Sequence, residues 1–389
     1  METSTEQPII EEVKSWDDLS LNEHVLRSIY NYGFENPSEI QRKAIKPILT
    51  GKDVIAQAQS GTGKTGAFVI GSLCQIDVSK PVTQVIILAP THELVNQIHT
   101  VVQNLSMFLT GFISRTIVGG TSINEDIQSL RANVPHLIVG CTGRVYDMMK
   151  RGAISTRQVT TCVLDEADEM LSFGFKDQIY NIFQMLPSQV QIVLFSATMP
   201  EPIIKMTEKF MRDPIKIMMV PEQLNLEGIK QYYLAMYDDN AKYDRLKDIF
   251  QTLSSSQTII YANNVNRVID LYNAMMEEGF SVCCIHSNMT KDERKQVITR
   301  FRSGNYRVLI SSNITARGID VQQVNTVINF DIPRSVETYL HRIGRSGRWG
   351  RKGVAINFVT KPDIFHMKAI EAHYRINIEE MPANLVIAP

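Results

Sequence analysis

The stretch AQSGTGKT, residues 58–65, follows the strand-like run DVIAQ (53–57) and precedes the helix-compatible stretch GAFVIGSLCQI (66–76). A strand, a glycine-rich loop and a helix in this order form a P-loop, although Ala58 stands where the general pattern has its first glycine. Glycines let backbone N–H groups turn toward phosphate oxygens, and the helix N-terminus adds positive potential. We therefore expect a nucleoside triphosphate to bind through Ser60, Gly61, Thr62, Gly63, Lys64 and Thr65. Lys64 would contact the β- and γ-phosphates, and the Thr65 hydroxyl would be a ligand of Mg²⁺.

A P-loop enzyme also needs a carboxylate at the end of a neighbouring strand, and VLDE at 163–166 supplies two. The apolar residues predict a buried strand that ends in the two acids. Asp165 would hold Mg²⁺, partly through water. Glu166, beside the metal rather than bound to it, would orient or deprotonate the attacking water.

The rest of the chain alternates short apolar runs with amphipathic stretches, a pattern typical of parallel sheets covered by helices on both faces. The pattern pauses at MVPEQLNLEG (219–228) and then restarts. At roughly 150 residues per domain, a chain of 389 residues suits two domains. We expect an α/β protein with an N-terminal extension at 1–20, a first domain at 21–218, a short linker at 219–228 and a second domain at 229–389.

Composition narrows the class of protein. The chain has 40 Lys and Arg against 41 Asp and Glu, which excludes a uniformly basic nucleic-acid coat. Its five cysteines form no C-x-x-C pair, so reduced thiols in the cytoplasm or nucleus are expected.

The N-terminal stretch is polar and no apolar run has the ~20 residues needed to span a bilayer, so no membrane association is expected. HELVN at 92–96 lacks the second histidine of a zinc site, because Asn96 occupies that position.

Asp165-Glu166-Ala167-Asp168 spells the signature of the DEAD-box RNA helicases of superfamily 2, and the chain resembles that family from Trp16 to Pro382. The closest likeness is to the translation initiation factor 4A group. The resemblance implies two tandem RecA-like domains, with ATP, Mg²⁺ and single-stranded or short duplex RNA bound across their cleft. It also implies a monomeric RNA-dependent ATPase that works with protein cofactors, such as a scaffold of the initiation machinery.

Further motifs carry the nucleotide side of the resemblance. GFENPSEIQ at 33–41 is similar to the family's Q motif, in which Phe34 would stack on adenine and Gln41 would bond its N6/N7 edge. Ser196-Ala197-Thr198 is similar to the third motif, whose hydroxyls would bridge to Asp168 and couple nucleotide binding to domain closure.

HRIGRSGR at 341–348 holds three arginines at three-residue spacing, which clusters guanidinium groups on one side of a helix and calls for an anionic partner. By resemblance, Arg345 and Arg348 are arginine fingers that reach the γ-phosphate. ARGID at 316–320 is similar to the fifth motif, which implies that Asp320 accepts from the ribose hydroxyls and that Arg317 lies near the interdomain contact.

The resemblance also implies that RNA is held by its sugar–phosphate backbone, which makes binding independent of sequence and sensitive to salt. The expected contacts of the first domain are Pro90, Thr91, His92, Gly119, Gly120, Thr142, Gly143 and Arg144. Those of the second domain are Ser287, Arg294 and Ser312.

These segments depart from the family, whereas the ATP motifs do not. His92 replaces an arginine, which exchanges a permanent charge for a side chain that is mostly neutral at pH 7. Cys141-Thr142 stands where the family has Thr-Pro, Ser287-Asn288 where it has Gly-Asp, and Ser311-Ser312-Asn313 where it has Thr-Thr-Asp. We therefore predict an intact ATP site with weaker or altered coupling to RNA.

Other functions remain open at this stage. An RNA- or protein-binding module with weak or lost ATP turnover would fit the substituted RNA segments. A small-substrate P-loop kinase would leave the second domain unexplained, and a DNA translocase would share most of the motifs. Roles in splicing-linked or ribosomal RNA handling compete with translation initiation.

Overall fold

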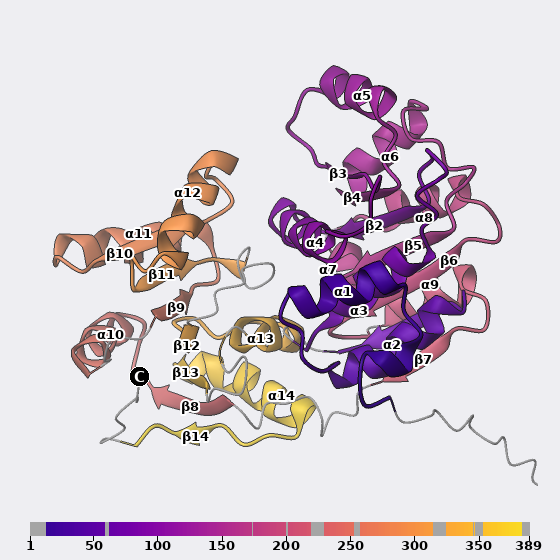
Figure 1. The fold of residues 1–389 in the computed structure, drawn as a ribbon. Coiled ribbons are helices and arrows are strands. Elements are labelled where there is room, and N and C mark those ends of the chain that lie inside the picture. The colour runs from indigo at the N-terminus through magenta and orange to yellow at the C-terminus, as the bar shows by residue number, and fades with distance from the viewer. Residues whose placement is uncertain are drawn as a thin grey trace, which may run out of the picture. The chain divides into compact units, whose positions relative to one another are not determined.

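The computed structural model describes residues 13–58, 62–172, 174–199, 201–218, 229–252, 257–313, 324–344, 346 and 353–382. The chain divides into two compact units, Met1–Met219 and Val220–Pro389. The expected linker at 219–228 lies outside the described residues. Each unit is an α/β structure built on one parallel sheet (Figure 1).

The first unit has a seven-stranded parallel sheet in the order β3-β4-β2-β5-β6-β1-β7. Its strands are β1 (Val54–Gln57), β2 (Val85–Ala89), β3 (Ser114–Ile117), β4 (Leu137–Cys141), β5 (Thr161–Asp165), β6 (Gln191–Ser196) and β7 (Ile215–Met218). Its helices are α1 (Glu23–Asn31), α2 (Glu39–Leu49), α3 (Lys64–Gln75), α4 (His92–Leu105), α5 (Ile123–Ala132), α6 (Thr142–Lys150), α7 (Ala167–Ser172), α8 (Lys176–Met185) and α9 (Glu201–Phe210), after a 3₁₀ turn at Asp17–Leu19.

Alternate residues of each strand enter different cores, which is why the strand runs are apolar throughout. In β1, Val54 and Ala56 pack with residues of α1 to α4, whereas Ile55 packs with residues of α5 to α9. In β2, Ile87 joins the first core and Ile86 the second. Helices therefore cover both faces of the sheet, as the sequence pattern predicted.

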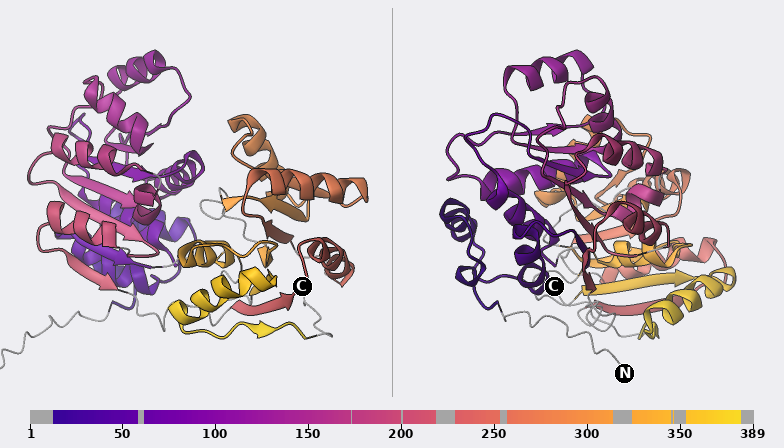
Figure 2. Two further views of the ribbon diagram at one scale, coloured as in Figure 1. Left: turned by 180° about the vertical axis from the view of Figure 1, so that it is seen from behind. Right: turned by 90° about the vertical axis from the view of Figure 1, so that its right-hand side faces the viewer.

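The second unit repeats this plan of a sheet flanked by helices, seen from two further sides in Figure 2. Its strand order is β10-β11-β9-β12-β13-β8-β14. Its strands are β8 (Ile229–Ala235), β9 (Gln257–Tyr261), β10 (Val282–Ile285), β11 (Val308–Ser311), β12 (Val324–Asn329), β13 (Gly353–Val359) and β14 (Glu379–Glu380). Its helices are α10 (Asn240–Thr252), α11 (Val265–Glu277), α12 (Lys291–Arg302), α13 (Val336–Ile343) and α14 (Ile364–Tyr374), with a 3₁₀ turn at Lys361–Asp363. Helices α12 to α14 share one core and α10 and α11 the other.

The predicted fold class, two α/β units with parallel sheets flanked by helices, is confirmed. In a parallel sheet the carboxyl ends of all strands meet at one edge, where ligands of such folds bind. In the first unit this edge holds the ends of β1, β5 and β6. The P-loop follows β1, Asp165 ends β5 and is followed by Glu166, and Ser196 ends β6. Of the helices described, none is long and apolar enough to cross a membrane. All five cysteines are free thiols, and Cys162 and Cys283 are buried.

Candidate nucleotide and RNA sites

The P-loop helix α3 begins at Lys64, directly after Gly63. Gly63 has φ of 98°, in the left-handed region that favours glycine, so the turn into the helix depends on this residue. Lys64 is 5% exposed, and Thr62 and Thr65 are half-buried. The expected phosphate ligands Ser60 and Gly61 lie outside the described residues.

Lys64 reaches across the sheet edge to the acids at the end of β5. Its Nζ lies 3.1 Å from Oε1 of Glu166, and both side chains are buried. Glu166 has φ of 53°, an uncommon conformation for a residue with a side chain and one that clusters at functional sites. Its backbone N–H donates to Oδ1 of Asp165 at 3.1 Å. The lysine and the two acids thus form one buried cluster at the carboxyl edge.

Burial governs the charges of this cluster. It raises the pKa of Asp165 to about 7, while Lys64 lowers it and Glu166 raises it further. Burial also acts to lower the pKa of Lys64, but the charges of Glu166, Asp165 and Asp168 outweigh that effect and raise it. Three buried carboxyl groups therefore face one ammonium. Such an oxygen-rich, net acidic set fits Mg²⁺, so the residues present suit the expected metal.

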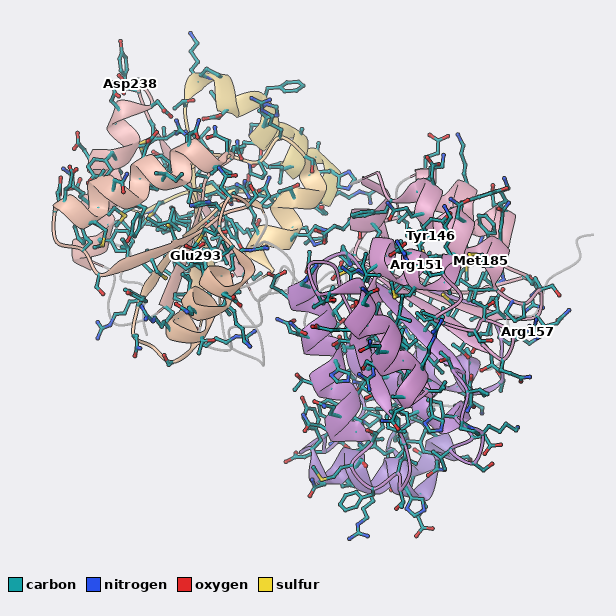
Figure 3. The ribbon with its side chains drawn as sticks, turned by 90° about the horizontal axis from the view of Figure 1, so that it is seen from above. Tyr146, Arg151, Arg157, Met185, Asp238 and Glu293 are labelled. Atoms are coloured by element: carbon teal, nitrogen blue, oxygen red, sulfur yellow. The ribbon has the colours of Figure 1, made fainter. Side chains whose placement is uncertain are left out.

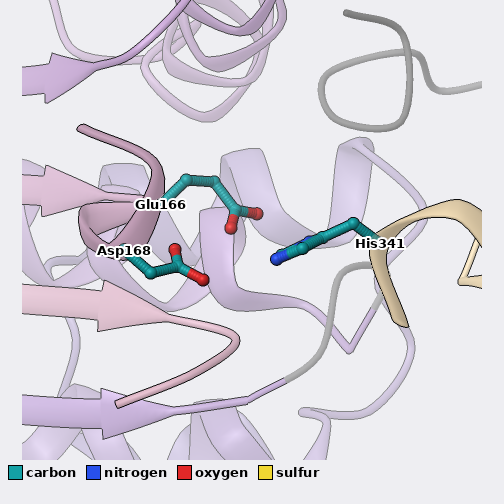
Figure 4. A group of neighbouring side chains, drawn as sticks. All are labelled: Glu166, Asp168 and His341. Atoms are coloured by element: carbon teal, nitrogen blue, oxygen red, sulfur yellow. The ribbon is translucent and has the colours of Figure 1, made fainter. Parts of the chain in front are cut away.

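Asp168 connects this cluster to the last residue of β6 and to the segment that follows it. Its backbone N–H donates to Oγ of Ser196 at 3.3 Å, and Oγ1 of Thr198 donates to its Oδ2 at 2.7 Å. Figure 4 shows that the carboxylates of Glu166 and Asp168 extend from the same turn. The hydroxyl contacts expected from the sequence are present, and their role in coupling stays a prediction.

The Q-motif residues lie against the P-loop helix. Nε2 of Gln41 donates to the carbonyl of Gly63 at 3.1 Å, and its Oε1 accepts from the Ser38 N–H at 2.8 Å. A Cβ at Gly66 would lie 2.6 Å from Nε2 of Gln41 and 3.3 Å from the Phe34 ring. The two contacts fix the orientation of the Gln41 amide and leave one N–H and one lone pair for adenine. Sequence reasoning missed Gly66, although a glycine inside a helix was the available signal.

The ring of Phe34 also contacts two aromatic residues, Trp16 and Tyr32. It stacks on that of Trp16, with centroids 6.2 Å apart, and meets Tyr32 edge-on at 4.9 Å. The Trp16 indole N–H donates to the Phe34 carbonyl at 3.1 Å. The segment before α1 therefore supports the ring proposed to stack on adenine.

The first segments predicted to contact RNA meet at the start of α4. Thr91 caps this helix, accepting from the Leu94 N–H at 3.2 Å, and His92 is its first residue. A Cβ at Gly119 would lie 3.8 Å from Nε2 of His92, so these residues are neighbours. Gly120, with φ of 81°, continues the turn. Pro90 follows β2 at the carboxyl edge of the sheet.

Two further predicted RNA contacts use their side chains inside the protein. The Thr142 hydroxyl is buried and donates to Sδ of Met170 at 3.3 Å. The Arg144 guanidinium pairs with Asp126 and donates at 3.0 Å to both the hydroxyl and the carbonyl of Thr121. The N-terminus of α6 lies at these positions, and backbone N–H groups at a helix N-terminus can bind a phosphate, so an RNA contact here stays a prediction. Gly143, in the same turn, lies close to Gln178.

The second unit presents its RNA candidates at the ends of β10 and β11. Ser287 is exposed and its hydroxyl donates to Oδ1 of Asn288 at 3.4 Å. Arg294 lies in the first turn of α12, which is capped by Thr290 and Glu293. Glu293 is labelled in Figure 3. Ser312 is 8% exposed and follows β11. The side chain of the adjoining Asn313 accepts hydrogen bonds from Arg342.

The proposed arginine fingers Arg345 and Arg348, and the fifth-motif residues Arg317 and Asp320, lie outside the described residues. The neighbouring Arg342 was not assigned a role from the sequence. It is fully buried and makes five hydrogen bonds, and its place in an arginine-rich run gave no means of telling it from its neighbours.

Comparison with known proteins identifies the family. The DEAD/DEAH box helicase domain matches residues 38–206, and the helicase conserved C-terminal domain matches 241–350. The chain is 50% identical over 373 residues to a eukaryotic initiation factor 4A of Caenorhabditis elegans, covering 96% of this chain and 92% of that protein. Among solved structures it is similar to S. cerevisiae Dbp5 bound to RNA and ADP BeF3, with TM-score 0.89, 35% identity and 96% of each chain covered. It is also similar to Mss116p bound to ssRNA and AMP-PNP, with TM-score 0.85, 25% identity, and 95% of this chain and 79% of that chain covered. Two tandem RecA-like units with these motifs and relatives therefore place the chain in the DEAD-box helicase family, among the RNA-dependent ATPases of the initiation factor 4A group.

Proposed function

We propose that the chain hydrolyses ATP to ADP and phosphate when it is bound to RNA, and that it uses this cycle to unwind short duplexes locally or to clamp single strands. The observation that carries the proposal is the buried cluster of Lys64, Asp165 and Glu166 at the carboxyl edge of the first sheet. A lysine at the start of the P-loop helix and acids at a neighbouring strand end are the parts that phosphoryl transfer from a nucleotide requires.

In this proposal each residue has one task. Lys64 moves from Glu166 to donate to the β- and γ-phosphates, which frees the glutamate to accept a proton from the attacking water. Thr65 and Asp165 would hold Mg²⁺, which neutralises phosphate charge when it is bound. Gln41 and Phe34 select adenine, because guanine reverses the donor and acceptor positions that a fixed amide can read.

The second unit completes the site. Arg345 and Arg348 stabilise the charge that develops on the γ-phosphate, and such a finger contributes about 10³–10⁵ in rate. Asp320 accepts from the ribose hydroxyls. Arg317, Asp168, Ser196 and Thr198 couple nucleotide binding to closure on RNA. Support comes from the motif positions in the sequence and, for Asp168, from its bonds to Ser196 and Thr198.

RNA is the proposed macromolecular substrate, because Dbp5 and Mss116p are solved with RNA. The likeness to initiation factor 4A supports a cytoplasmic role in translation initiation, with a protein of the initiation machinery as scaffold. Dbp5 is also solved bound to Gle1, which supports regulation of this chain by a protein partner. We propose that the chain itself is a monomer.

A second candidate is a binding module with little ATP turnover. It is favoured by the internal bonds of Arg144 and Thr142, which occupy two side chains expected to face RNA.

The deciding experiment is ATPase activity with and without single-stranded RNA, run beside unwinding of a short duplex. We expect RNA to stimulate hydrolysis in the wild type. Glu166→Gln should lower kcat by about 10²-fold or more while ATP still binds, because the general base is lost. Glu125→Gln, at an exposed position of α5, is the matched control and should behave as the wild type. Hydrolysis that persists in Glu166→Gln would disprove the catalytic assignment, and a wild type without turnover would establish the binding module.

A further inference from the structure

Arg342 lies in a cage of neutral oxygens in the second unit. Its Nε and one NH2 group both donate to Oδ1 of Asn313, at 2.9 and 2.5 Å. The remaining N–H groups donate to Oδ1 of Asn263 at 2.7 Å, to Oδ1 of Asn329 at 3.1 Å and to the backbone carbonyl of Asp331 at 2.7 Å. All five donors of the guanidinium are therefore used, so the side chain is held in one position.

Within the described part of the chain, no carboxylate oxygen bonds this guanidinium. The nearby carboxylate of Asp331 is engaged by Arg267 at 2.7 Å and by Lys242 at 3.3 Å. Burial accordingly lowers the pKa of Arg342 to about 10, although Tyr261 and Asp331 act in the opposite direction. A fully buried cation with only neutral acceptors is held less strongly than one paired with a carboxylate.

The bonds of Arg342 join two segments that matter for the proposed reaction. Asn313 follows Ser312 at the end of β11, on the side expected to face RNA, and precedes residues 314–323 with Arg317 and Asp320. Arg342 lies in the last turn of α13, three positions before Arg345. One side chain thus ties the residues that follow β11 to α13, the helix that precedes Arg345 and Arg348 in the sequence.

We propose that Asn313 is a positioning residue for ATP hydrolysis that acts through Arg342. The Asn313–Arg342 contact transmits RNA binding at the end of β11 to α13, the helix that precedes Arg345 and Arg348 in the sequence. The neutral amide makes this transmission weaker than it would be with an aspartate. The inference deepens the proposed function and rests on it.

The contact between the Asn313 amide and Arg342 can be strengthened by a substitution that keeps its geometry. Only Oδ1 of the amide is used by Arg342, and its Nδ2 makes no hydrogen bond to the described residues. An aspartate would therefore fit the same place, keep both bonds to Arg342, and turn them from bonds of a cation to a neutral oxygen into bonds between opposite charges. A stiffer contact should raise the coupling between nucleotide and RNA, which is reciprocal in binding free energy.

The test measures coupling directly. The dissociation constant of a labelled oligouridine is determined with and without AMP-PNP and Mg²⁺, and the ratio of the two is the coupling factor. We expect Asn313→Asp to raise this factor by about threefold or more, and Asn313→Ala to lower it by a similar amount. Asn273→Asp, at an exposed position of α11, adds the same charge elsewhere in the unit and should leave the factor unchanged.

Thermal unfolding separates a structural role from a positioning role. If the two Asn313 variants shift the melting temperature but leave the coupling factor within about twofold of the wild type, Asn313 only stabilises the unit and the inference is wrong. If the coupling factor of the wild type is one, nucleotide does not affect RNA affinity, which counts against the proposed function itself. In that case the inference requires Asn313→Asp to raise the factor above one, and a factor of one in this variant too would overturn the inference as well.

Discussion

The Thr198 hydroxyl donates a 2.7 Å hydrogen bond to Oδ2 of Asp168, and both side chains are buried. The backbone N–H of Asp168 also donates to Oγ of Ser196. The end of β6 and the segment after it are therefore joined to the turn that holds Glu166. A movement of either segment must be shared by the other, because a buried carboxylate cannot give up a donor without cost.

The first prediction concerns this contact. Thr198→Val keeps the shape of the side chain but leaves Asp168 without one donor, so the first unit should lose about 1–3 kcal/mol of stability. We expect basal ATP hydrolysis to change less than the number of duplexes unwound per ATP. Urea unfolding and parallel ATPase and unwinding assays measure both effects. Thr100→Val, whose exposed hydroxyl bonds only within α4, is the control. Equal loss of hydrolysis and unwinding would argue against a coupling role.

The second prediction is a pH dependence. Burial raises the pKa of Asp165 to about 7, far above its value of 3.8 in an unfolded chain. The folded protein therefore binds an extra proton between these values, and the resulting stability is full below pH 3.8 and lost as the pH rises through about 7. Metal-free protein should show a larger fall in melting temperature over this range than Asp165→Asn. A wild type and variant with parallel pH profiles would contradict the assignment.

The affinity for Mg²⁺ should also depend on Asp165, but it should rise with pH, whereas the stability of the metal-free protein falls. Mg²⁺ needs the ionised carboxylate, so below about pH 7 its apparent affinity should fall by about tenfold per pH unit. Calorimetric titration of the protein with Mg²⁺ and AMP-PNP measures this slope. Asp165→Asn should lose both the slope and most of the affinity.

The third prediction concerns His92 at the start of α4. His92→Arg adds a permanent charge beside Gly119, so RNA affinity should rise and the slope of log affinity against log salt should steepen by about 0.7–0.9. Fluorescence anisotropy over a series of salt concentrations measures both quantities. His24→Arg, at an exposed position of α1, controls for net charge. Equal gains in the two variants would show that position 92 has no special contact with RNA.

The fourth prediction tests how closely α2 and α3 pack. A Cβ at Gly71 would lie 2.6 Å from Cγ2 of Ile48, so Gly71→Ala should destabilise the first unit by about 1–3 kcal/mol, despite the better helix propensity of alanine. Combining it with Ile48→Ala removes the closest contact, that with Cγ2, so the double variant should lose less than the sum of the two single losses. Urea unfolding of all three variants provides the cycle, and additive losses would show that the helices can separate freely.

Local patterns decided much of the site. Lys64, Asp165 and Glu166 could be predicted because their positions relative to a strand or helix end are short-range properties, and parallel strands bring such ends to one edge. The continuous apolar runs likewise predicted sheets buried on both faces. The amino-acid sequence alone therefore determined the fold class and the family.

The tertiary structure decided how the remaining side chains are used. Arg144 is neutralised by Asp126 from α5, and Gln41 is fixed by the carbonyl of Gly63. Arg342 is enclosed by amides from the ends of three strands. These partners come from elements distant in the chain, and a motif specifies the identity of a residue but not its neighbours in space. Whether a polar side chain faces a ligand or the interior is set by packing between such elements, because a buried polar group must find its partner wherever the fold provides one.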